Sequence, residues 1–138
     1  MTTTYALRVC RADMTSRDGF VWPSEIGAVV KAPDWNPAPV CGGGLHGWLH
    51  GRGDPGSTDY WRDPEARWLV LAVDAGRVVP LEGKGKFPEA TVAFVGDLVD
   101  AAAWLIAHDP EAIPSEVIGV CLSGQHVAVA DLGVATAG

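Results

Sequence analysis

The sequence lacks any long apolar run. No stretch reaches the roughly 18 to 20 consecutive apolar residues that a membrane-spanning helix requires. Residues 1–5 also lack the basic and apolar regions of a secretory signal peptide. We therefore expect a cytoplasmic protein that does not bind a membrane.

Basic residues are scarce. The chain has 10 Lys and Arg residues against 17 Asp and Glu residues, which gives a formal net charge of −7. Such a field repels phosphate backbones and anionic lipids, so we expect no nucleic-acid partner. The acidic residues are spread along the chain, which indicates a solvated surface. An acidic inhibitor carried by a mobile element stays an alternative.

Cysteine is also rare. The three cysteines, Cys10, Cys41 and Cys121, are odd in number and far apart, which is untypical of a disulfide framework. Cys41, His46 and His50 have a C-x4-H-x3-H spacing that would permit zinc binding, but no C-x2-C pair is present. We expect these residues to pack without a metal, and we predict no cofactor.

What is present indicates one packed domain. Hydrophobic residues make up 48% of the 138 residues, which is enough for a single core. Period-two alternation over residues 3–11 predicts a half-buried strand, and the apolar segments 68–73 and 90–95 predict two more. Shorter extended runs are expected at residues 20–23, 26–31, 45–49 and 77–81.

One helix is predicted, over residues 97–108. Leu98, Ala101, Ala102, Leu105 and Ile106 recur at spacings of three and four residues, and Asp97 or Gly96 can cap the start. Asp109-Pro110 would end the helix. The predicted fold is therefore α+β, a mostly antiparallel sheet with this helix packed on one face.

The remaining segments are predicted to be less regular. Prolines and the triplet at residues 42–44 favour an ordered loop over residues 32–56, and residues 83–86 resemble a flexible basic link. Residues 117–122 and 126–130 predict a C-terminal hairpin that leads toward a β-solenoid. We therefore expect a compact domain over residues 1–130 and a tail of small residues at 131–138, the start of a repeat.

Several residues are candidates for a functional role. Six tryptophans are many for this length, and Trp35, Trp48 and Trp61 lie in the loop region, where they would anchor the loop or form a binding surface. Arg8, His46, Tyr60 and a following glutamate look similar to the NAD-binding residues of the ADP-ribosyltransferase superfamily. That superfamily binds NAD with an Arg or His, a Tyr or Ser, and a Glu. The resemblance implies Arg8 or His46 at the Arg or His position, Tyr60 at the Tyr or Ser position, and Glu89 or Glu116 at the Glu position.

A second resemblance covers nearly the whole chain. The segments FVWP from residue 20, APDWNP from residue 32, CGGGLHGWL from residue 41, ARWLV from residue 66 and KFPEATVAFVG from residue 86 resemble the N-terminal domain of a group of uncharacterised bacterial and phage-associated proteins. In that group, tandem repeats similar to G-x-A-T-A-G often follow, and residues 133–138 (GVATAG) match one unit. Such repeats resemble those of ice-nucleation-type β-solenoids.

These observations support three hypotheses. The first is a non-enzymatic interaction or capping head that binds a protein partner or itself through the loop at residues 35–61, with an exposed apolar patch and no deep polar cleft. The second is an ADP-ribosyltransferase-like protein, active or degenerate, with a cleft where Arg8, His46, Tyr60 and a glutamate converge. The third, an acidic inhibitor, predicts carboxylates gathered on one face.

Overall fold

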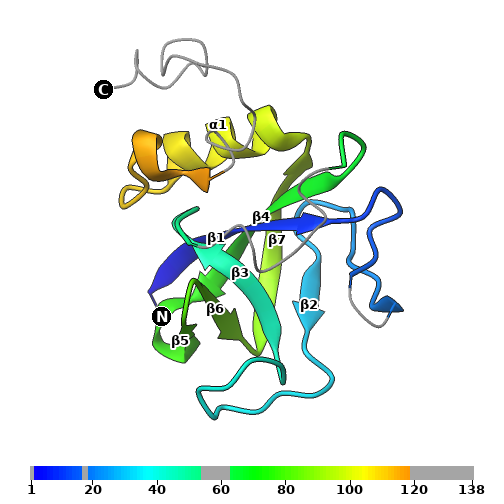
Figure 1. The fold of residues 1–138 in the computed structure, drawn as a ribbon, viewed down its shortest axis with the longest axis vertical. Coiled ribbons are helices and arrows are strands. Elements are labelled where there is room, and N and C mark those ends of the chain that lie inside the picture. Colours follow the sequence, from blue (N-terminus) through cyan, green and yellow to red (C-terminus); the bar gives the residue numbers. More distant parts are fainter. Residues whose placement is uncertain (1, 17–18, 54–62, 119–138) are drawn as a thin grey trace.

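The computed structural model describes residues 2–16, 19–53 and 63–118. Strands dominate these ranges, and one α-helix and two short 3-10 helices accompany them (Figure 1). In chain order the elements are β1 (Thr3–Cys10), β2 (Val29–Lys31), β3 (Leu45–Leu49), β4 (Arg67–Asp74), η4 (Ala75–Arg77), β5 (Val79–Leu81), β6 (Lys84–Phe87), β7 (Glu89–Gly96), α1 (Leu98–His108) and η5 (Pro114–Glu116).

The strands form a single antiparallel sheet in the order β2-β7-β4-β1-β3-β6-β5. β1 pairs with β4 along all its residues, from Thr3 opposite Asp74 to Cys10 opposite Arg67. Only Pro88 separates β6 from β7, yet the two strands lie far apart in the strand order. The sheet must therefore curl, so that one continuous extended segment supplies strands to both of its sides.

The concave face of the curled sheet holds one of two hydrophobic clusters. Val30 of β2 and Phe87 of β6 belong to this cluster although their strands are distant in the strand order. Ala6 and Cys10 of β1 reach it from the middle of the sheet and are fully buried. Trp22, 2% exposed, closes it from the loop between β1 and β2. The curl therefore brings side chains from distant strands of the sheet into one core.

Helix α1 covers the opposite face of the sheet (Figure 1). Its buried residues Ala101, Ala102 and Leu105 pack in a second cluster with Leu7, Val9, Trp48, Trp68 and Val70. Trp48 and Trp68 stack with ring centroids 5.9 Å apart. The Asp97 side chain accepts a 2.8 Å hydrogen bond from the Asp100 amide and so caps the first turn.

The structure confirms the predicted fold class, the helix and the strands at residues 45–49, 68–73 and 90–95. Two local predictions were wrong. Residues 83–86 are not a flexible link, because Lys84–Phe87 form β6 between β3 and β5. β1 is not half-buried, because its second half contributes buried residues to both clusters, Ala6 and Cys10 on one face and Leu7 and Val9 on the other. Of the predicted C-terminal hairpin, residues 117 and 118 belong to no described strand, and the rest of it and the domain boundary at residue 130 lie outside the described residues.

In the part of the chain that the structure describes, no helix has the length and apolar character needed to cross a membrane.

Removing the helix cap should destabilise the domain moderately. We expect Asp97→Ala to lower the free energy of unfolding by about 1 kcal/mol, because the Asp100 amide loses its acceptor. Asp97→Asn keeps an acceptor and should stay close to the wild type. Urea denaturation followed by circular dichroism measures both variants, and equal losses in the two would show that the cap bond is not the cause.

Candidate functional site

Strand β3 borders two polar sites, one beside His46 near its start and one at the turn just after its end. The first is a cavity of about 410 Å³. The glycine-rich loop at residues 41–44, β1 and the aromatic residues Phe20 and Trp22 line it, and Lys84 of β6 contributes a charge. The volume lies within the range of small-molecule binding sites.

Arg8 connects β1 to β3 at this cavity. Its Nη1 donates a 2.7 Å hydrogen bond to the backbone oxygen of His46, and its guanidinium carbon lies 4.4 Å from the centre of the Trp22 ring. The Arg8 Nε is buried and has no hydrogen-bond partner among the described residues. Burial raises the pKa of the neighbouring Cys10 thiol, although Arg8 acts in the opposite direction.

The imidazole of His46 is held in its neutral form. Its pKa falls from the ordinary 6.5 to about 4, first because burial disfavours the charged ring and then because Lys84, Arg8 and Lys86 repel a further positive charge. Nε2 of His46 accepts a 3.2 Å hydrogen bond from the Gly42 amide, which a protonated ring nitrogen could not do.

The loop before β3 is fixed by a buried lysine. Lys86 is fully buried in β6, and its Nζ donates to the backbone oxygens of Val40 at 2.9 Å and Gly42 at 3.0 Å. Gly43 has a φ of 64°, and a Cβ there would lie 2.6 Å from the Asn36 Cβ. A glycine is therefore required where the loop closes on itself.

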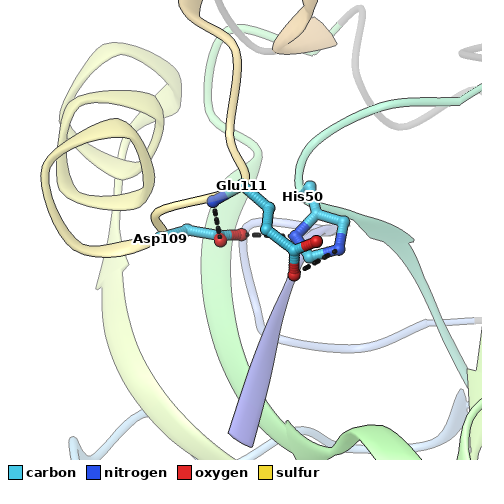
Figure 2. A group of neighbouring side chains, drawn as sticks. All are labelled: His50, Asp109 and Glu111. Carbon is cyan, nitrogen blue, oxygen red and sulfur yellow. Dashed lines mark hydrogen bonds and ion pairs between the residues drawn. The ribbon is translucent and has the colours of Figure 1, made fainter.

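The second site joins the turn after β3 to the segment that follows α1. His50, with a φ of 57°, projects its ring between Asp109 and Glu111 (Figure 2). Its Nδ1 donates to the buried Asp109 Oδ2 at 2.8 Å, since an ionised carboxylate only accepts. Its Nε2 lies 3.6 Å from the Glu111 Oε2, and the Glu111 side chain is 70% exposed.

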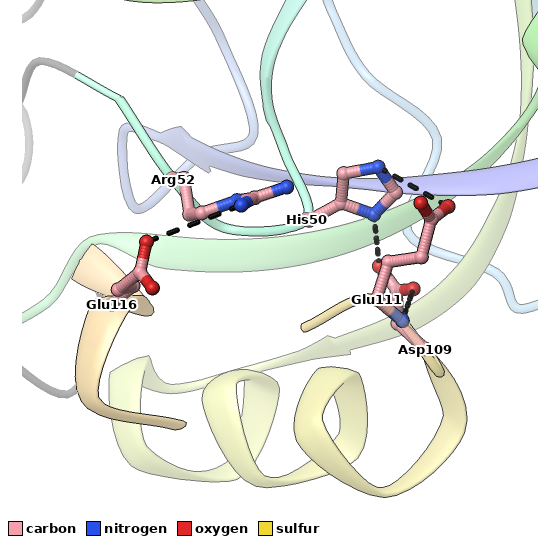
Figure 3. Close-up of polar contacts among 5 residues, drawn as sticks. All are labelled: His50, Arg52, Asp109, Glu111 and Glu116. Atoms are coloured by element: carbon pink, nitrogen blue, oxygen red, sulfur yellow. Dashed lines mark hydrogen bonds and ion pairs between the residues drawn. The ribbon is translucent and has the colours of Figure 1, made fainter. Parts of the chain in front are cut away.

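Further contacts extend this junction along the post-helix segment, which we define as residues 109–118. Arg52 reaches Glu116 at 4.0 Å on the other side of the turn (Figure 3). The Ile118 amide donates to the Gly51 oxygen at 2.8 Å. A Cβ at Gly51 would lie 2.7 Å from the Leu105 Cδ2, so turn, helix and segment are tightly packed.

The predicted zinc candidates do not form one group. Among the described residues, the only set of three donors close enough to hold a metal is His50, Asp109 and Glu111, whose donor atoms lie within 4.8 Å of one another. His50 therefore faces the junction, whereas Cys41 and His46 line the cavity. The Cys41 Sγ accepts from the Lys84 Nζ at 3.3 Å.

The other candidates are also dispersed. Arg8 and His46 meet at the cavity, but Glu89 is exposed opposite Lys31 and Glu116 belongs to the junction, so neither lines the cavity. Tyr60 and Trp61 lie outside the described residues. The head hypothesis predicts no deep polar cleft, whereas this cavity is lined by charged groups.

The predicted tryptophan surface needs correction. Trp48 is 3% exposed and belongs to the core under α1 because it faces Trp68 and not solvent. Trp35 is half-buried, and its ring centre lies 5.7 Å from the Lys86 Nζ.

Sequence reasoning missed Lys86, Asp109 and Glu111. Lys84 and Lys86 alternate with glycines, and a period of two is typical of a strand. Their charge instead favours a solvated link. Asp109 was recognised only as part of the helix stop. Its pairing with His50 spans 59 positions, which no local pattern reveals.

Comparisons with known proteins place the chain in a bacterial context. A family model described as "Domain of unknown function (DUF7666)" matches residues 4–103. The chain is 33% identical over 104 residues to the ice nucleation protein InaU of Pantoea ananas, which covers 74% of the chain and 10% of the relative. It is 36% identical over 107 residues to an ice nucleation protein of Xanthomonas campestris pv. translucens, covering 76% of the chain and 7% of the relative. The chain thus matches about a tenth of the length of these relatives, and no solved structure matches it.

The buried carboxylate at the junction should matter more than its exposed neighbour. We expect Asp109→Ala to lower the free energy of unfolding by about 1–3 kcal/mol, because it leaves the His50 Nδ1 and the Glu111 amide without their acceptor. Glu111→Ala should change it by at most about 0.5 kcal/mol. Urea denaturation tests both, and similar losses would contradict the assigned role of Asp109.

The depressed pKa of His46 predicts a pH-dependent stability. Between pH 6.5 and about 4 the unfolded chain binds a proton at His46 that the folded chain does not, so stability falls as the pH decreases through this window. His46→Gln keeps an acceptor for the Gly42 amide and should flatten this dependence. Denaturation at several pH values measures it, and an unchanged slope in the variant would assign the dependence to other groups.

Proposed function

The chain belongs to the DUF7666 family, and on this premise we propose that it is a non-catalytic head domain of a bacterial protein. The head fixes the direction of the chain that follows it. It also associates with copies of itself. The observation that carries the proposal is the junction at which the post-helix segment is tied to the turn after β3.

The junction holds the end of the described chain at several points. Asp109 pairs with His50 in a buried contact, the Ile118 amide bonds to Gly51, and Val117 is fully buried beside Leu105. The exposed Arg52–Glu116 pair at 4.0 Å adds little energy. A capping domain needs such an anchored exit, because repeat units stack only when the first one is held in a defined orientation.

The relatives and the sequence support the same role. Ice nucleation proteins match the chain over about a tenth of their own length, as expected of a head attached to a much longer region. Residues 133–138 (GVATAG) follow the post-helix segment in the sequence and have the small-residue composition of a tight solenoid turn.

The described residues favour binding over catalysis. At the cavity, the ring nitrogen of His46 that would act as a base already accepts from Gly42. Among the residues lining the described part of the cavity, Asp34 is the only carboxylate, and neither Glu89 nor Glu116 reaches it. Among the described residues, the cavity therefore lacks the glutamate that the transferase hypothesis requires.

The self-association surface that we propose is the outer edge of β2 and not the loop at residues 35–61. β2 ends the strand order, and in the described part of the chain no strand pairs with its outer side. Val29 on β2 is 54% exposed and Ile26 just before it is 67% exposed. An open edge with apolar branched side chains is a template for pairing with a second strand.

Charge placed on this edge should separate the copies. We expect the wild-type chain to form a dimer at high concentration in sedimentation velocity and native mass spectrometry, and Val29→Glu to be monomeric. Val40→Glu is the matched control, because Val40 is 53% exposed and lies in the loop before β3. A monomeric wild type over the whole concentration series would overturn self-association. Dissociation by both variants would show a general charge effect and not a β2 interface.

A further inference from the structure

The cavity beside β3 is the strongest unexplained feature of the molecule, and the head function makes no use of it. Its volume of about 410 Å³ exceeds what a single inorganic ion would fill. Arg8 and Lys84 line it and carry positive charge, whereas Asp34 supplies the negative charge among the described lining residues. The site is therefore locally basic in a chain whose net charge is −7.

Two further observations show that this positive charge acts on the cavity. Lys86 lies behind the loop, where its Nζ is held by the Val40 and Gly42 oxygens. Burial is the main cause of the lowered pKa of His46, and Lys84, Arg8 and Lys86 lower it further against the opposing effect of Asp34, so the three cations act on a side chain that lines the cavity. An anion in the cavity would offset this field.

Arg8 retains unused donor capacity. A guanidinium group has five N–H donors, of which Nη1 serves the His46 oxygen at 2.7 Å. The Nε is buried and has no hydrogen-bond partner in the described ranges. Arg8 is positioned by this backbone contact and by the Trp22 ring 4.4 Å away, so its fork is fixed before any ligand arrives.

Apart from the charged groups, the lining combines glycine backbone and the polar residues Ser16 and His46 with aromatic side chains. Phe20 and Trp22 meet edge to face with ring centroids 5.7 Å apart, and Leu45 adds a further apolar side chain. Such surfaces favour a flat ring on the ligand. We propose that this cavity binds a small organic anion, a carboxylate or phosphate ester carried on an aromatic or heterocyclic ring, with Arg8 and Lys84 facing the charged group.

The test is isothermal titration calorimetry on the full chain with phenyl phosphate, benzoate and the uncharged benzamide. We expect both anions, or the one whose geometry suits the site, to bind at least tenfold more tightly than benzamide. The stronger of the two distinguishes a phosphate ester from a carboxylate. If neither anion binds more tightly than benzamide, the proposal is wrong.

Three variants locate the binding. Lys84→Met should weaken anion binding about tenfold or more, which corresponds to about 1.4 kcal/mol. Arg77→Met is the matched control, because it removes one positive charge from the exposed turn η4, outside both the cavity lining and β2, and its affinity should equal that of the wild type. Asp34→Asn should strengthen binding several-fold, because it removes a carboxylate from the cavity wall.

The opposite directions of these effects keep the test decisive even if one variant folds poorly. Equal weakening by Lys84→Met and Arg77→Met would indicate a non-specific charge effect and would overturn the site. An Asp34→Asn variant that folds normally and binds no better than the wild type would do the same. Circular dichroism verifies the fold of each variant.

Discussion

The structure depends on one constraint, the continuity of β6 and β7 through Pro88. Because these consecutive strands pair with β3 on one side of the sheet and with β4 on the other, the sheet has to curl around the cluster that contains Phe87 and Val30. The curl leaves the opposite face free for α1. It also brings the lysines of β6 to the loop before β3, where Lys86 holds two backbone oxygens.

Strand β3 links the two polar regions that result. His46 near its start borders the cavity and is kept neutral by burial and by neighbouring cations. His50, just after its end, adopts a positive φ and turns to the post-helix segment, where a buried carboxylate accepts from it. Two histidines four positions apart, which suggest a single metal site in the sequence, therefore serve separate contacts. One orders a loop and the other anchors the end of the described chain.

The sequence predicted those features that local patterns determine. The periodicity of residues 97–108 and the Asp97 cap identified α1, and the alternation in residues 3–11 identified β1. Features set by distant contacts were not accessible. Lys86 resembles a solvated link residue in the sequence. It is buried because its strand pairs with β3, which no local pattern indicates. Arg8 and His46 were identified as candidates and do meet, but the partner carboxylates of His50 come from 59 and 61 positions away. Trp48 lies in a segment that the sequence predicts as a loop surface. Its burial comes from α1, which is distant in the sequence.

The contacts after α1 fix the post-helix segment to the domain. The most direct measurement is native-state hydrogen exchange of the Ile118 amide, which donates to the Gly51 oxygen at 2.8 Å. We expect this amide to exchange as slowly as the core amides of β4, such as those of Leu69 and Val70, because it opens only when the domain unfolds. Exchange as fast as that of an exposed turn amide would contradict this, since the segment would then not be fixed to the domain.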